Sequence, residues 1–312
     1  MGETGAGRRR SARGRGMLLA LASAAGFSTL GLFAKLIYSE GFSVPQSLAW
    51  RFTVAAAILW AIIGASSRKS STRRPPLGKR LVPVALLGAF GFAPQAGLYF
   101  ATLSFLDPGI TSLLLYLYPS FVILLSLVLF RKKPGRIQLL SLGLSLAGCA
   151  ITFFKPRDYP VAGLALGALV AVAYGAYLVA GDRVLEGADP VRATALIMLE
   201  AAAIYWIAAA ATGPVRAPST PAAIAGVLGI ALFATVLPIT ALFAAMRDIG
   251  ASDASLVSTV EPVLTVALSA LLIGERLAAA QAVGGALILA AVLVLRFVPG
   301  GSAPSPARAD IE

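Results

Sequence analysis

Ionisable side chains stand inside long apolar stretches of this sequence, where a charge has chemical consequences. The residues concerned are Lys35, Arg51, Glu200 and Glu261. A charge at the centre of a bilayer costs roughly 2.5–3.5 kcal/mol on insertion scales, so such residues are usually paired, held in a cavity or neutralised. Glu261 directly precedes Pro262, and we predict that it binds a proton or lines a substrate pathway, with structural pairing as the alternative. Glu200 has no proline beside it and is expected to be structural.

Lys35 and Arg51 lie nearer to one end of their apolar stretches than Glu261 does. Each carries its charge on a long aliphatic stem, which can extend to the membrane interface. The other interpretation is that the two cations attract or hold the carboxylate of a substrate. The sequence leaves both interpretations open.

Tyrosines recur within the apolar stretches, deeper than the belt of aromatic residues found at membrane interfaces. A buried tyrosine needs a polar partner for its hydroxyl. These side chains could therefore line a cavity for an amphipathic metabolite, or they could pack in the interior with satisfied hydroxyls. The tyrosines that we assign to a substrate pathway are Tyr99, Tyr116, Tyr118, Tyr174 and Tyr177.

Prolines interrupt the apolar stretches at Pro94, Pro119, Pro238 and Pro262. A proline removes one backbone donor and frees the carbonyl four residues earlier. Neighbouring helices can satisfy such a carbonyl, so a single proline would indicate little. Proline-interrupted segments at corresponding places in two halves point instead to a transporter's binding site. We predict that these four prolines kink their helices and open a central cavity.

The correspondence between the halves is visible in the sequence itself. Residues 99–130 and 242–273 align without a gap, so that Phe100 matches Phe243, Ser112 matches Ser255 and Pro119 matches Pro262. Five apolar stretches precede the second copy of the unit, and an odd number of spans makes that copy insert upside down. Chance similarity between two apolar sequences is the alternative.

The elements that must position these residues are membrane-spanning helices. Hydrophobic residues make up 58% of the chain and charged residues 13%, against roughly 25% charged in soluble domains. About 20 consecutive apolar residues suffice to cross a bilayer. We therefore predict an all-α membrane protein with ten transmembrane helices arranged as two inverted five-helix repeats, at residues 17–39, 44–65, 80–103, 108–130, 136–154, 160–181, 190–212, 221–246, 252–273 and 277–297.

Basic residues set the expected orientation. The net charge of +12 is concentrated in the amino-terminal tail and in the loops 66–80 and 131–136. Short loops rich in Lys and Arg stay in the cytoplasm, so this charge indicates a membrane topology and not nucleic-acid binding. We predict a multi-pass protein of the inner (plasma) membrane with both termini cytoplasmic. Its expected parts are a basic tail (1–16), two repeats (17–155 and 156–298) and a disordered tail (299–312).

Residue types typical of catalysis are scarce. The chain has no histidine and one cysteine, Cys149. No phosphate-binding GxxxxGK[ST] sequence, metal-ligand cluster or nucleophile–base pair is visible. We expect a protein that is not an enzyme and that uses neither a metal nor a cofactor. The sequence does not indicate an oligomeric state.

Particular segments make the chain resemble a known family. They are AAGFSTLGLFAKL up to Lys35, AWRFTVAAAIL around Arg51, and VSTVEPVLTVALSALLIGERLAAAQAVGG from Val257 to Gly285. With these segments the chain resembles the EamA-type ten-helix carriers of the drug/metabolite transporter superfamily. One departure is that Lys132 occupies the first-half position that matches Glu275.

The resemblance implies an inverted-repeat carrier that moves small metabolites, often outward, across an inner membrane. One branch of the family exports amino acids, including aromatic ones, and we place the chain nearest that branch. We accordingly expect a secondary transporter that exports amino acids or related small metabolites by alternating access, with Glu261 responding to protons. A multidrug or cation efflux carrier and a membrane sensor without transport are the alternatives.

Overall fold

The computed structural model describes residues 3–69, 77–118, 121–122, 125, 135–153, 159–185, 188–258, 260–274, 276 and 278–297. Every regular element in these ranges is a helix. Pro119 and the carboxy-terminal tail 299–312 lie outside the described residues.

The first half of the chain contains short and long helices in alternation. They are α1 (Glu3–Ser28), α2 (Leu30–Ser39), α3 (Val44–Lys69), the 3₁₀ turn η1 (Gly78–Arg80), α4 (Leu81–Leu86), the π-helical segment η2 (Leu87–Phe92), α5 (Ala93–Phe105), α6 (Pro108–Leu115) and α8 (Arg136–Phe153). The second half contains α9 (Val161–Val184), α10 (Pro190–Thr212), α11 (Pro221–Ala231), the π-helical segment η3 (Leu232–Val236), α12 (Leu237–Ser258), α13 (Glu261–Leu272) and α14 (Ala279–Phe297).

A π-helical segment precedes a proline in each half. η2 ends two residues before Pro94, and η3 ends two residues before Pro238. A π turn adds one residue to the helix and weakens the regular i to i−4 bonding, while the proline removes a donor from the next turn. The π turn and the proline lie together in both halves. The α4–η2–α5 and α11–η3–α12 helices therefore each have one deformable section, at corresponding places.

A second break occurs just before the other proline of each half. α6 ends at Leu115 and is followed by a turn at Tyr116–Leu117; α12 ends at Ser258, and α13 begins at Glu261. Pro262 thus lies in the first turn of α13, where its missing N–H would have had no partner in any case. The sequence predicts a kink inside the helix, whereas the structure shows a new helix starting at this proline.

The link between the eighth and ninth expected spans differs from the prediction. The spans end at 246 and begin again at 252, but α12 continues through these residues. The first half breaks at this place, because Pro108 starts α6 and its missing donor ends the previous helix. The aligned residue of the second half is Ala251, a strong helix former. The helix therefore runs on to Ser258.

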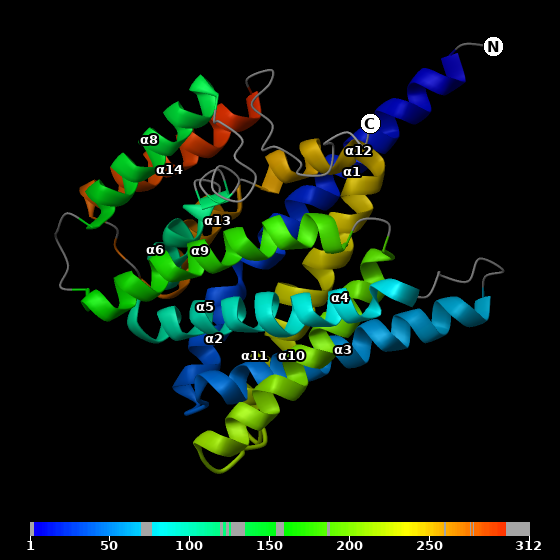
Figure 1. The fold of residues 1–312 in the computed structure, drawn as a ribbon, viewed down its shortest axis with the longest axis vertical. Coiled ribbons are helices and arrows are strands. Elements are labelled where there is room, and N and C mark those ends of the chain that lie inside the picture. The colour runs from blue at the N-terminus through cyan, green and yellow to red at the C-terminus, as the bar shows by residue number, and fades with distance from the viewer. Residues whose placement is uncertain are drawn as a thin grey trace.

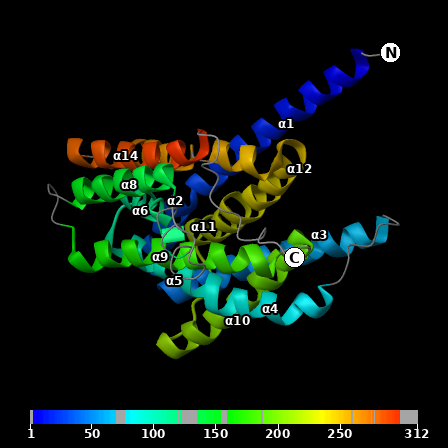
Figure 2. The ribbon, with the colours of Figure 1, turned by 45° about the horizontal axis from the view of Figure 1, so that its top comes forward.

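Helices of the two halves pack directly against each other. α3 packs on α10, α8 on α14, and α6 on α13, while α1 packs on α12 and α5 packs on α9. Figures 1 and 2 show α8 beside α14 at one edge of the molecule and α3 beside α10 at the opposite edge. One large apolar cluster lies between α3, α5, α10 and α11, and a smaller one joins α6, α9 and α14.

Six segments of the described chain are long and apolar enough to cross a membrane. They are 14–39, 44–65, 78–105, 161–181, 191–212 and 221–242. α13 and the apolar parts of α8 and α14 are shorter than a full span in the residues that the structure describes. The protein is thus an all-helical, multi-pass membrane protein, and the full set of ten spans stays a prediction.

Candidate functional site

Arg51 is a buried cation in the middle of the protein. It lies on α3 with 6% of its surface exposed, and its Nε donates a hydrogen bond to Oγ1 of Thr235, 3.0 Å away. Thr235 belongs to the π-helical segment η3, and its own hydroxyl donates to the carbonyl of Ile230 at 2.8 Å. The hydroxyl of the π turn therefore gives Arg51 its position.

Aromatic rings surround the rest of the guanidinium. Its Cζ lies 4.9 Å from the ring centre of Phe52 and 5.4 Å from that of Phe100. Rings at these distances attract a cation through their negative faces. In the part of the chain that the structure describes, the one ion pair joins Arg15 to Asp248, at 2.8 Å, so Arg51 has no carboxylate partner there.

Glu261 begins α13 and contacts the broken helix of the other half. The hydroxyl of Tyr116 lies 3.3 Å from Oε2 of Glu261 and 3.2 Å from the carbonyl oxygen of Ser258. Tyr116 is itself in the turn that ends α6. The two helix breaks, one from each half, are therefore joined by this tyrosine.

Tyr99 lies within electrostatic range of both charges. It is buried on α5, and it is close enough to both Arg51 and Glu261 to interact electrostatically with each of them. Tyr205 of α10 is also within electrostatic range of Arg51, and it donates its hydroxyl proton to the carbonyl of Ala93. The cation is thus enclosed by rings and hydroxyls contributed by both halves.

A continuous row of aromatic rings leads from Glu261 to Arg51. The ring centres of Tyr116 and Tyr118 are 5.9 Å apart, and those of Tyr118 and Tyr174 are 4.9 Å apart. Tyr174 stacks on Tyr177 at 6.2 Å. Phe92 then contacts Tyr177 at 5.8 Å and Phe52 at 5.5 Å, and the guanidinium of Arg51 lies over Phe52. Four of the five tyrosines singled out in the sequence, Tyr116, Tyr118, Tyr174 and Tyr177, are members of this row, and Tyr99 instead contacts Phe100.

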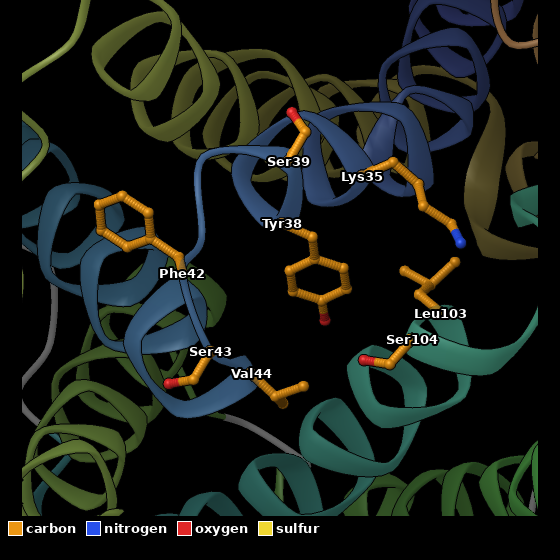
Figure 3. Close-up of a pocket in the computed structure, with 8 residues that line it drawn as sticks. All are labelled: Lys35, Tyr38, Ser39, Phe42, Ser43, Val44, Leu103 and Ser104. Carbon is orange, nitrogen blue, oxygen red and sulfur yellow. The ribbon is translucent and has the colours of Figure 1, made fainter. Parts of the chain in front are cut away.

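Lys35 lies apart from Arg51, in a pocket of about 460 Å³ between α2, the start of α3 and the end of α5. Figure 3 shows its ammonium group extending past Leu103, with the hydroxyls of Tyr38 and Ser104 turned toward each other. Both hydroxyls donate to the carbonyl of Phe100, at 2.7 and 3.4 Å. Two residues of the pocket wall therefore bond to the backbone of Phe100, and the ring of the same residue lies against Arg51.

Comparisons with known proteins decide the family. The model of the EamA-like transporter family matches residues 14–154 and again residues 161–297. The chain belongs to the EamA-like transporter family. The Bacillus subtilis protein "Uncharacterized transporter YyaM" is 26% identical over 265 residues, which cover 82% of this chain and 86% of that protein. The Synechocystis protein "Uncharacterized transporter sll1319" is 25% identical over 312 residues, covering 90% and 93%.

Two further comparisons add another relative and a match in fold. "Uncharacterized transporter YcbK" of Bacillus subtilis is 26% identical over 277 residues, covering 83% of this chain and 85% of the relative. A solved crystal structure matches with a TM-score of 0.62 at 22% identity, over 89% of this chain and 95% of that one, which shows the fold alone. Relatives named as transporters support a membrane transporter, and their names specify no substrate.

The prolines of this EamA-like transporter occupy two kinds of place. Pro94 and Pro238 follow the π-helical segments, and the carbonyl of buried Pro238 accepts a hydrogen bond from Oγ of Ser23 at 2.8 Å. Pro262 begins a helix beside Glu261. Of these three prolines, Pro94 and Pro238 thus follow a deformed helix segment, and Pro262 lies beside Glu261.

Glu200 stands on α10 against the other π-helical segment. Its Oε2 is buried and accepts no hydrogen bond from the residues that the structure describes. It faces Gly88 of η2, where an added Cβ would lie 2.3 Å from that oxygen. Arg51 on α3 meets η3 in the corresponding way. Each half therefore supplies one charged side chain to the π-helical segment of the other.

Sequence reasoning missed the partners of Arg51. Thr235 stands in an apolar run as a single polar residue, without a motif around it. Tyr205 belongs to AAAIYW, the counterpart of AAAILW at 55–60, and the tyrosine that replaces a leucine in this repeat was the available signal. Thr235 could have been noticed because it stands three residues before Pro238.

Proposed function

We propose that this EamA-like transporter is a secondary carrier that exports amino acids, including aromatic ones, or related small metabolites across the inner membrane by alternating access. The observation that carries the proposal is Arg51, a buried cation whose described partners are a hydroxyl and aromatic rings. A buried charge without a counter-ion is costly. The carboxylate of a substrate would supply that counter-ion.

The proposed route connects Arg51 with Glu261. Arg51 would bind the carboxylate, the row of rings from Phe52 to Tyr116 would contact the apolar part of the substrate, and Glu261 would hold or release a proton. Tyr99 is placed to contact a ligand at both ends because it lies near both charges. A substrate with a carboxylate and an aromatic or aliphatic side chain fits this order of groups.

Lys35 would act at the outer end of this route. Its pocket is separated from Arg51 by Tyr38 and Phe100, whose rings meet edge to face at 6.3 Å. Phe100 is fully buried, so a carboxylate can pass between Lys35 and Arg51 only if these rings move. We propose that the pair closes the route in the conformation described here.

Two inverted five-helix repeats are supported by the packing between the halves. α1 packs on α12 as α9 packs on α5, and α3 meets η3 as α10 meets η2. When each helix is replaced by its counterpart in the other half, each of these contacts becomes another contact that the structure contains. Inverted repeats of this kind rock against each other around a fixed site, and η2 and η3 would be the deformable sections.

The orientation follows from the basic loops. The segments 66–80 and 131–136 carry most of the loop charge of the first half, so we place them in the cytoplasm together with both termini. The turn between α2 and α3, which borders the Lys35 pocket, then faces the outside. Small-molecule substrate, lipid bilayer and protons are the partners that this proposal requires.

Flux through purified protein tests the proposal. The full chain is reconstituted in liposomes, and the uptake of a panel of labelled amino acids is measured with and without an imposed proton gradient. We expect protein-dependent flux of at least one amino acid, lowered by Arg51→Gln and not by Arg216→Gln, which removes a charge from an exposed side chain. Binding without flux would indicate a sensor, and flux of none of the panel would contradict amino-acid transport.

The tyrosines around Glu261 favour a second candidate, an efflux carrier for organic cations. Tyr116 contacts Glu261, and Tyr118 and Tyr174 stand next in the row of rings. A carboxylate among aromatic faces is an arrangement that binds quaternary ammonium groups. Resistance of cells to toxic cations on overexpression, abolished by Glu261→Gln, would support this candidate over amino-acid export.

A further inference from the structure

An apolar groove opens on the side of the molecule and meets the proposed route at Tyr177. It lies between the α4–η2–α5 helix and α9, and its volume is about 520 Å³. Small residues line part of it, among them Gly91, Ala173, Ala176 and Ala180, and larger ones line the rest. Of the larger ones, Phe90 is 77% exposed and Leu86 is 53% exposed. In a membrane these side chains face lipid.

The length of the groove matches one leaflet of a bilayer. Pro83 and Pro94 line it, and the eleven helical steps from one to the other span about 16 Å. The hydrocarbon core of a bilayer is about 30 Å thick, so one leaflet accounts for about 15 Å. A single acyl chain lying along α9 would fill such a groove from the membrane surface to the midplane.

Basic side chains stand at one end of the groove. Lys79 and Arg80 form the turn η1 directly before α4, and Nη1 of Arg80 donates to the carbonyl of Val184 at 3.3 Å. Val184 also lines the groove, so Arg80 is at its mouth. Within the described ranges neither cation is in a salt bridge with a carboxylate. Arginine carries five N–H donors, which leaves several for a phosphate.

We propose that this groove binds one phospholipid with an anionic headgroup, its phosphate at Lys79 and Arg80 and an acyl chain over the small residues of α9. Basic pockets between helices on the cytoplasmic side hold acidic headgroups, and the loop that ends at Arg80 is one of the basic segments of the chain. The proposal does not depend on the transported substrate.

The bound chain would touch a section of the protein that the transport proposal expects to move. Gly91 and Pro94 belong to η2 and the start of α5, and Tyr177 is the end of the row of tyrosines. A lipid in the groove would therefore contact the deformable section of one half. A carrier in a membrane without acidic lipid would lack this contact.

Native mass spectrometry of the full-length protein tests the proposal. The protein in mild detergent receives equal amounts of phosphatidylglycerol and phosphatidylcholine with identical acyl chains, and the bound lipids are counted. We expect the first bound lipid to be phosphatidylglycerol roughly 30 times more often than phosphatidylcholine, because two basic residues lie near the headgroup. The double variant Lys79→Gln/Arg80→Gln should bind both lipids almost equally. The charge-conserving Lys79→Arg/Arg80→Lys and the remote Arg136→Gln should keep the preference.

A substitution that fills the groove distinguishes the contribution of the acyl chain to binding from that of the headgroup. Ala176→Trp should reduce the retention of both lipids, whereas Ala225→Trp, at an exposed position of α11, should not. Equal binding of the two lipids by the unaltered protein would overturn the proposal, as would an unchanged preference in the double Gln variant. Conversion of a dimer to a monomer by Ala176→Trp, with lipid retained, would assign the groove to a contact between copies and would also overturn it.

Discussion

The hydroxyl of Tyr116 lies 3.3 Å from Oε2 of Glu261 and joins the two helices that break before a proline. One residue ends α6, and the other begins α13. A hydrogen bond between two helix ends is exchanged more easily than one inside two regular helices, because the regular backbone bonding of each helix stops there. This contact is therefore a place where the two halves can separate. A proton bound to Glu261 would change how strongly it holds Tyr116.

Replacing Glu261 by Gln tests the proton role. The amide oxygen of glutamine can still accept from Tyr116, but the side chain no longer titrates. We expect transport by Glu261→Gln to lose its pH dependence, measured as initial flux between pH 5 and 8 in liposomes. Glu40→Gln serves as the control, because Glu40 is in the turn after α2 and accepts a hydrogen bond from Thr220. A profile equal to that of the unaltered protein would rule out the proton role of Glu261.

Replacing Tyr116 by Phe removes the hydrogen bond and keeps the ring. We expect the two variants Tyr116→Phe and Glu261→Gln to be non-additive, with a coupling of about 0.5–3 kcal/mol in a double-mutant cycle of flux or thermal stability. Tyr159→Phe, at the loop before α9, provides the comparison and should be additive with Glu261→Gln. Full additivity of Tyr116→Phe and Glu261→Gln would mean that the contact has no energetic role.

Thr235 positions Arg51, so Thr235→Val should affect the protein through that arginine. The substitution leaves Nε of a buried guanidinium without its acceptor, which costs about 1–3 kcal/mol or more. We expect a lower melting temperature in detergent and a raised KM for the transported substrate. Thr240→Val is the matched control, because the hydroxyl of Thr240 bonds only to carbonyls of its own helix region, those of Val236 and Leu237. Equal effects of both variants would contradict a special role for Thr235.

Gly88 allows Glu200 to approach η2, and a methyl group there should be costly. In Gly88→Ala the new Cβ would lie 2.3 Å from Oε2 of Glu200 and 3.3 Å from Cγ1 of Ile197. Overpacking of this kind costs about 1–3 kcal/mol, and thermal unfolding in detergent should report it. Shortening the acid in Gly88→Ala/Glu200→Ala should restore much of the loss. Gly64→Ala, with open space around the position, should not destabilise, and a loss there equal to that of Gly88→Ala would count against the steric explanation.

Composition and spacing predicted the class of fold, because a bilayer imposes apolar helices on any chain that crosses it. The same pattern could not show which face of each helix is inward, because the apolar residues run all round it. Sequence alignment placed Pro119 opposite Pro262 and Tyr118 opposite Glu261. It did not show that Tyr116, two residues earlier, is the one that reaches Glu261, because the turn after α6 changes the direction of the chain.

The direction in which Thr235 faces Arg51 could not be predicted from the sequence for a related reason. A π turn inserts one residue and rotates everything after it by about 100°, so the side that Thr235 faces cannot be counted from a regular helix. One of the two interpretations of the sequence has Lys35 and Arg51 hold the same carboxylate, whereas the structure separates them by the rings of Tyr38 and Phe100. Tertiary packing decided that separation, since α2, α3 and α5 meet only in the folded protein.

The central claim is that Arg51 binds the carboxylate of the substrate, and one comparison tests it most directly. Transport of an aromatic amino acid and of the amine that lacks its carboxylate is measured in the same liposomes, for the unaltered protein and for Arg51→Gln. We predict that the unaltered protein prefers the amino acid by about 10-fold or more, the value of a charge-assisted hydrogen bond, and that Arg51→Gln loses this preference. Preference for the amine, or an amino-acid preference that survives in Arg51→Gln, would contradict the claim.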